Sequence, residues 1–310
     1  MSTLVLTHSA CLEHDAGEYH PECPDRLRAV LRALEAEEFA GLQRAEAPLA
    51  TPEQLALAHP ADYVSAILGI RPGPRERVAL DGDTLMNHAS AEAAQRAAGA
   101  AVAAVDAVCG GQALRAFCAT RPPGHHAEPS RPMGFCFFAN AVVAARHAQR
   151  AHGVGRVAIL DFDVHHGNGT QACVERDPSI FFASSHQWPC YPGTGHPKER
   201  GAGNVCNAIL PPGANGAAFR AAWEGMLLPA LRAFAPELVV ISAGFDAHAD
   251  DPLAQLNARE ADFVWLTDRL LEAADRHSGG RVVSLLEGGY DLDALANSVA
   301  AHLRCLMRAA

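Results

Sequence analysis

The sequence predicts an α/β fold in three layers, with a mostly parallel central sheet between helices. Short segments rich in β-branched and apolar residues alternate with longer helical patterns over most of the chain, and polar side chains follow many of the short segments directly. Strands and helices that alternate require crossover connections, which make the strands parallel and cover both faces of the sheet with helices. The polar side chains then gather at the carboxyl ends of the strands, where such sheets bind ligands.

The strands are predicted at short runs of apolar residues. The run at 157–160 lies between Gly155 and a Gly-rich turn, which is typical of a strand buried on both faces. The predicted strands are residues 3–7, 114–119, 156–161, 180–184, 238–242 and 281–286. The predicted helices are residues 89–108, 137–151, 216–234, 259–277 and 292–307, with another beginning near Asp25.

Composition and charge narrow the classes of function. The chain has 310 residues without a Gly/Ser linker, a like-charge block or a repeat, so we expect residues 1–310 to form a single domain. A formal net charge of −10 disfavours nucleic acid, because phosphate contacts need a basic patch. It suits cationic substrates, although an acidic surface can serve solubility alone.

The sequence also bears on location. No apolar run approaches the ~20 residues of a membrane helix, and no basic segment precedes the first apolar run. We therefore expect no membrane span and no secretory signal. The nine cysteines include no CxxC pair and suit the reduced core of a cytoplasmic protein. The Ala- and Arg-rich composition, with Lys198 as the single lysine, suggests a bacterial source.

Asp161, Asp163 and His165 follow the predicted strand at 156–161. Alternate residues of a strand share a face, so these side chains are expected to point the same way. Two carboxylates and an imidazole are costly to bury together unless a cation holds them. Asp246 follows another strand and completes the three ligands that a catalytic zinc typically takes. Singly, each residue also suits a turn or capping role, and only the combination predicts a metal site.

His125 and His126 follow a Pro-Pro-Gly sequence that keeps them on a loop, where both can line one pocket. Asp161 and Asn168 are the candidate partners of the two rings, and one charged and one neutral partner would push the two pKa values apart. Such a division suits a general base and a general acid. The base role is assigned to His125 or to the pair jointly.

Tyr290 follows a Gly-Gly pair that lets the backbone approach the predicted site closely. Its phenol could donate a hydrogen bond to an oxyanion that develops on a carbonyl group. The alternative is a tyrosine that packs at the start of the last helix.

Four segments resemble those of the zinc-dependent histone deacetylase superfamily and occur in the family's order. They are RPPGHHA at 121–127, DFDVHHGNGT at 161–170, SAGFDAH at 242–248 and EGGYD at 287–291. With the His-Pro-Glu at 20–22, the resemblance covers essentially the whole chain. It is closest to the class II branch and its bacterial relatives, because class I members have aspartate where Asn168 stands. The resemblance implies an arginase-like α/β fold and hydrolysis of an N-acyl amide, most often an acetylated lysine side chain or a polyamine.

The resemblance also implies roles for single residues. Asp163, His165 and Asp246 would bind Zn2+, with Fe2+ as the alternative metal. The implied catalytic residues are His125, His126, Tyr290, Asp161 and Asn168. Asp161, Asp163, His165 and Ser184 would form a structural monovalent-cation site, which takes K+ in the family.

The substrate residues are implied in the same way. Gly134, Phe135 and Tyr191 match the walls of a narrow acyl-lysine tunnel, with tyrosine where the family usually has phenylalanine. Asp83 matches the rim aspartate that holds the substrate backbone, and Arg26 the arginine near an acetate exit channel. Acetylpolyamine-selective relatives have an acidic gatekeeper where Leu253 stands, which favours acyl-lysine or another acylated amine over polyamines.

Other functions are also compatible with the sequence. An acetylpolyamine amidohydrolase shares all of this chemistry, and a catalytically silent module that binds acylated amines would keep the pocket without turnover. A two-metal ureohydrolase is disfavoured, because Gly167 and Asn168 stand where further bridging aspartates would be needed. Whether the amine partner is a protein or a metabolite, and whether the chain forms a homo-oligomer, is not determined by the sequence.

Overall fold

The computed structural model describes residues 3–308, and its centre is a sheet of eight strands in the order β2-β1-β5-β10-β9-β6-β7-β8. Every neighbouring pair of strands in this sheet is parallel. The strands are β1 (Thr3–Thr7), β2 (Gln43–Glu46), β5 (Arg115–Cys118), β6 (Val157–Asp161), β7 (Ile180–Gln187), β8 (Val205–Leu210), β9 (Leu238–Ala243) and β10 (Val282–Leu286). The predicted α/β fold with a parallel sheet is thus confirmed.

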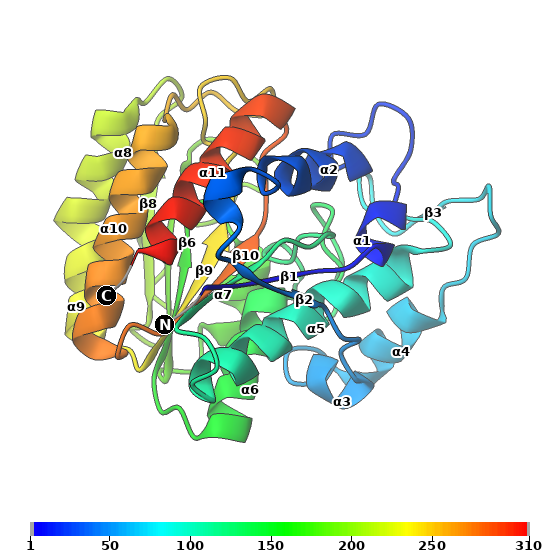
Figure 1. Ribbon diagram of the computed structural model, residues 1–310, viewed down its shortest axis with the longest axis horizontal. Coiled ribbons are helices and arrows are strands. Elements are labelled where there is room, and N and C mark those ends of the chain that lie inside the picture. Colours follow the sequence, from blue (N-terminus) through cyan, green and yellow to red (C-terminus); the bar gives the residue numbers. More distant parts are fainter. Residues whose placement is uncertain (1–2, 309–310) are drawn as a thin grey trace.

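Helices cover both faces of the sheet (Figure 1). One face carries α2 (Pro24–Ala33), α8 (Gly216–Ala222), α9 (Leu228–Phe234), α10 (Glu260–His277) and α11 (Leu292–Met307). The other carries α5 (Ser90–Cys109), α6 (Asn140–His152) and α7 (Asn168–Val174). In β6, Ala158 and Leu160 pack on the first face while Val157 and Ile159 pack on the second, so the whole apolar run is buried.

Shorter elements lie outside these layers. They are α1 (Ala10–Glu13), α3 (Pro52–Leu55), α4 (Ala61–Gly69), a 3-10 turn (Glu37–Phe39) and the antiparallel hairpin of β3 (Val78–Ala79) and β4 (Leu85–Met86). Within the described part of the chain, no helix has the length and apolar character that a membrane span requires.

The predicted elements are found with small shifts at their ends, and two kinds of difference are informative. Strands β2 and β8 were both missed. Strand β2 lies at the sheet edge with all four residues exposed, so no apolar pattern marks it. The helix predicted at 216–234 is found over these residues, but its middle, Trp223–Leu227, is π-helical and separates α8 from α9. Pro229 lacks the N–H of a regular α-helical hydrogen bond, which favours an irregular turn before it.

Because all strands of the main sheet are parallel, their carboxyl ends lie at one edge. The loops after β1, β5, β6, β7, β9 and β10 therefore meet there, and these loops carry most of the residues predicted for the site.

Candidate active site

Asp163, His165 and Asp246 converge beyond the ends of the neighbouring strands β6 and β9. Their ligand-type atoms all lie within 4.8 Å of one another. The Nδ1 atom of His165 is 3.1 Å from Asp163 Oδ1 and 3.1 Å from Asp246 Oδ2. Strand β6 ends at Asp161, so Asp163 and His165 lie on the turn after it. The expectation that they share a strand face is wrong, although they converge as expected.

The environment of this cluster suits a divalent cation. Asp163 and Asp246 are buried, and the backbone N–H of Gly288 donates to Asp163 Oδ2 at 2.8 Å. Burial, followed by the charge of Asp163, raises the pKa of Asp246 to about 7. A Cβ atom on Gly288 would collide with carboxylate oxygens of both aspartates, so glycine keeps this space open. One imidazole nitrogen and two carboxylates form a donor set that zinc and ferrous iron both accept.

The loop after β5 places His125 and His126 beside the cluster, each with the partner expected for it. Nδ1 of His125 is 3.0 Å from Asp161 Oδ2, and Nδ1 of His126 is 2.8 Å from Asn168 Oδ1. The two ring centroids are 4.0 Å apart. Because Nδ1 of each ring is occupied, the Nε2 atoms are the ones left to exchange protons in the pocket.

The two imidazoles differ in their affinity for a proton. Burial lowers the pKa of His125, but the negative charges of Asp163 and Asp161 outweigh burial and raise it to about 10. Burial lowers the pKa of His126 well below its usual value, and the neighbouring His125 and His165 add to the effect. The pKa values are shifted in opposite directions, in line with the unequal partners.

Two glutamates that sequence reasoning did not single out support the histidine loop. Glu287 accepts hydrogen bonds from the backbone N–H groups of Gly124 at 2.7 Å and His125 at 3.2 Å. Glu128 accepts a hydrogen bond from Asn168 Nδ2 at 2.8 Å. The position of Glu287 directly after a predicted strand was a usable signal, whereas nothing in the local sequence marks Glu128.

Tyr290 is held by contacts on both sides. The guanidinium of Arg26 lies 4.7 Å from the centroid of its ring, and Asp251 accepts a hydrogen bond from its backbone N–H at 2.7 Å. Arg26 itself is fully buried, pairs with Glu22 at 3.0 Å, and donates to the carbonyl oxygen of Gly289 at 2.5 Å. Burial raises the pKa of Tyr290 well above its usual value, so the phenol keeps its proton.

A cavity of about 220 Å³ that opens to the surface lies beside these groups. The lining residues are Asp83, His126, Gly134, Phe135, His165, Tyr191, Leu253 and Tyr290. All the residues predicted to contact substrate are therefore brought together. Gly134 has φ +55°, and a Cβ there would collide with the ring of His126, so only glycine fits this wall.

The outer part of the cavity combines aromatic, aliphatic and acidic groups. The Phe135 ring centroid is 6.0 Å from that of Tyr290, and the Tyr191 centroid is 5.2 Å from that of His126. Tyr191 is 39% exposed and Leu253 is 37% exposed, which places both near the opening. Burial, and then the neighbouring Asp81, raise the pKa of Asp83.

Ser184 lies opposite Asp161 in the pairing of β6 with β7, and its Oγ is 2.9 Å from His186 Nδ1. The two residues are adjacent, as a shared cation site requires, but binding of K+ by this group stays a prediction.

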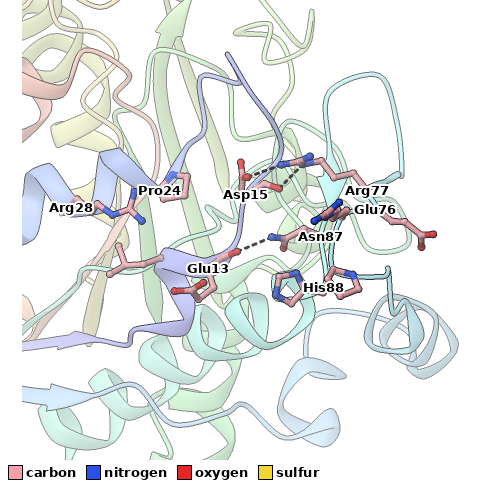
Figure 2. Close-up of a pocket in the computed structure, with 11 residues that line it drawn as sticks. Glu13, Asp15, Pro24, Arg28, Glu76, Arg77, Asn87 and His88 are labelled. Atoms are coloured by element: carbon pink, nitrogen blue, oxygen red, sulfur yellow. Dashed lines mark hydrogen bonds and ion pairs between the residues drawn. The ribbon is translucent and has the colours of Figure 1, made fainter.

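A larger cavity, of about 600 Å³, opens elsewhere in the molecule and has a different character (Figure 2). Arg77 pairs with Asp15 at 2.6 Å, and Asn87 donates to the carbonyl oxygen of Glu13 at 2.8 Å. Arg28, which also lines this cavity, pairs with Asp25 at 2.8 Å. Two of its three arginines are thus held in ion pairs within the protein, and the residues predicted for the site line the smaller cavity, which is the better candidate for the active site.

Comparison with known proteins points to one family. The histone deacetylase domain matches residues 20–306. Histone deacetylase 14, chloroplastic, of Arabidopsis thaliana is 40% identical over 98% of this chain and 76% of its own length. The histone deacetylase-like amidohydrolase of Pseudomonas aeruginosa is 40% identical over 93% of this chain and 77% of its own.

A human protein and a solved structure are also similar to this chain. The polyamine deacetylase HDAC10 of Homo sapiens is 38% identical over 93% of this chain and 45% of its own length. The crystal structure of the HDA15 HD domain superposes with a TM-score of 0.92 at 35% identity, and covers 99% of this chain and 88% of that one.

Proposed function

The chain belongs to the histone deacetylase family, and from this premise we propose that it is a zinc-dependent amidohydrolase that deacetylates lysine side chains or related acylated amines. One observation carries the proposal: the buried Asp-His-Asp cluster, the two histidines with unlike partners and the protonated tyrosine meet at one cavity, which His165, His126 and Tyr290 line. Hydrolysis of an amide needs these three functions within reach of one carbonyl group.

Asp163, His165 and Asp246 would hold the metal ion, because they are the buried group of donors at this site. When bound, zinc or ferrous iron would polarise the acyl carbonyl and lower the pKa of a water molecule. The backbone donors on Asp163 and Asp246 fix the orientation of both carboxylates.

His125 and His126 carry the protons. One ring removes a proton from the attacking water and one delivers a proton to the nitrogen atom as the C–N bond breaks, which yields a carboxylate and an amine. Asp161 stabilises the charged form of His125, whereas the neutral Asn168 gives His126 no such charge. Glu287 holds the loop through the backbone N–H of His125 and so keeps both rings in place.

Tyr290 supplies the hydrogen-bond donor for the oxyanion. Its buried phenol keeps a proton to donate, and the Arg26 guanidinium stacked on its ring holds it against the cavity. Such a preorganised donor acts on charge that develops only as the water attacks, so it accelerates the chemical step rather than substrate binding.

The cavity favours an acyl group on a long, uncharged stem. Phe135 and Tyr191 offer aromatic surfaces for the methylene groups of a lysine side chain, and Asp83 can accept hydrogen bonds from a peptide backbone. Leu253 provides no charge to attract a distal ammonium. Acetyl-lysine is thus the proposed substrate, and acetylpolyamine is the alternative because one relative is named a polyamine deacetylase.

The test is a turnover assay of the metal-loaded protein on an acetyl-lysine peptide and on acetylputrescine in parallel, with Asp163→Ala as the inactive control. We expect hydrolysis of the peptide and little hydrolysis of acetylputrescine, with Leu253→Glu shifting the ratio toward the polyamine. Preference of the unaltered protein for acetylputrescine would overturn the substrate assignment. Failure to hydrolyse either compound, with metal bound, would indicate a silent binding module.

A further inference from the structure

A second cluster of ligand-type side chains lies on the helical layer, away from the candidate active site. Among the described residues, Asp106, His147 and His152 are the group, besides the active-site cluster, whose donor atoms lie within 4.8 Å of one another. Nε2 of His147 and Nε2 of His152 are each 2.7 Å from the same atom, Asp106 Oδ1. The two ring centroids are 5.9 Å apart.

The fold brings the three residues together from two helices. Asp106 is in the last turn of α5, and His147 and His152 are on α6. Helix α5 leads into β5 and α6 leads into β6, so both run against the strand direction and lie side by side (Figure 1). The cluster therefore lies at the amino ends of the strands, opposite the edge that carries the candidate active site.

The end of α6 sets the direction of the second ring. His152 is the last residue of this helix, and Gly153 follows in the left-handed region at φ +67°. His147 and His152 are five residues apart, and both rings reach the same aspartate oxygen.

The electrostatic field at this place favours a cation. The carboxyl ends of α5 and α6 both lie here, and a helix carries partial negative charge at its carboxyl end. The Asp106 carboxylate adds a full negative charge. A cation is therefore stabilised between the three groups.

The donor atoms suit a transition metal better than a hard cation. Two imidazole nitrogens and one carboxylate oxygen form a set that Zn2+, Co2+ and Ni2+ bind, whereas Mg2+ and Ca2+ favour oxygen ligands. The side chains of His147, His152 and Asp106 are 12%, 25% and 52% exposed, so an ion can reach them. A hollow of about 360 Å³, lined also by Arg150, lies beside His147.

We propose that Asp106, His147 and His152 form a second metal site, specific for a divalent transition metal such as zinc. It is independent of the proposed deacetylase activity, because it lies at the other edge of the sheet and shares no ligand with the first cluster. When a metal ion binds, each Nε2 atom coordinates it and no longer carries the proton that it otherwise donates to Asp106 in a hydrogen bond.

The test is the zinc content of chelator-stripped protein after equilibration with Zn2+ and removal of excess metal. We expect two zinc ions per chain in the unaltered protein and one in the double variant His147→Gln, His152→Gln, with deacetylase activity retained. Asp163→Asn should also bind one, because it loses the other site. His88→Gln, which replaces an exposed histidine outside both clusters, should keep two.

Cobalt gives a second readout that does not depend on activity. Co2+ added to Asp163→Asn should produce visible absorption bands that disappear when His147 and His152 are also replaced. Asp106→Asn replaces the double variant if the latter does not fold, and should lower zinc affinity at least tenfold. One zinc ion in the unaltered protein, or two in the double variant, would overturn the proposal and leave only a hydrogen-bonded Asp-His cluster.

Discussion

The two clusters use the same types of side chain, aspartate and histidine, in opposite surroundings. Asp163, His165 and Asp246 are buried, whereas the Asp106 side chain is 52% exposed. Water can solvate the exposed Asp106, whereas the charge of Asp163 raises the pKa of the buried Asp246, and two carboxylates buried together need a cation. The proposed catalytic centre and the proposed peripheral site therefore differ more in burial than in the types of ligand that they offer.

The largest effect is expected for Asp163→Ala. Removal of a buried ligand should abolish turnover and release one zinc ion, because the remaining two residues leave an incomplete site. Metal analysis and an acetyl-lysine assay on the same preparation check this. Substantial activity in the variant would contradict the assignment of the buried cluster, and unchanged folding by circular dichroism is the required control.

Tyr290→Phe should lower kcat by about two to three orders of magnitude, which corresponds to ~3 kcal/mol for the loss of one oxyanion donor. KM and zinc content should change little, because the ring and its contact with Arg26 remain. Steady-state kinetics with parallel metal analysis separates this result from the loss of a ligand. Near-normal kcat would exclude Tyr290 as the donor.

Glu128→Gln tests the hydrogen-bonded chain from Glu128 through Asn168 to His126. The variant should lower kcat by about tenfold, which is the lower end of the loss that follows when an outer residue that orients an active-site side chain is replaced. Loss of the negative charge makes the His126 imidazole harder to protonate. The limb of the kcat/KM pH profile that reports His126 should therefore move to lower pH. A variant with reduced kcat and an unmoved profile would indicate a purely structural role.

The smallest effect is expected at the surface cluster without metal. The pKa of Asp106 is lower in the folded state than in the unfolded chain, where it is 3.8. The Asp106 charge therefore stabilises the fold at a pH above 3.8, and this contribution disappears as the pH falls through the lower folded pKa. Asp106→Asn should then cost less than about 1 kcal/mol at neutral pH, as for other exposed pairs.

Urea unfolding of Asp106→Asn and the unaltered protein near neutral pH and at low pH checks this last expectation. Added zinc should widen the difference at neutral pH, because an ion bound to the folded state stabilises it. A neutral-pH difference of several kcal/mol without metal would mean that the cluster is more strongly coupled to the core than its exposure indicates.

Much of the fold and the active-site residues were predictable from local patterns. The strands at 157–161 and 238–243 appear as buried apolar runs, and each is followed within a few residues by Asp163 or Asp246. Glu128 was not predictable, because its partner Asn168 is 40 residues away and nothing near it in the sequence indicates the contact. Asp106 and His152 were missed for the same reason.

The sequence by itself determined which segments form strands and helices, because hydrophobic period and turn residues act between near neighbours. It also supplied the donor types of the active site. Only the tertiary structure decided which strand ends meet, since the order β5-β10-β9-β6 does not follow the chain. That order brings Glu287 to Gly124, 163 residues away, and parallel crossovers bring the carboxyl ends of α5 and α6 together at the other edge.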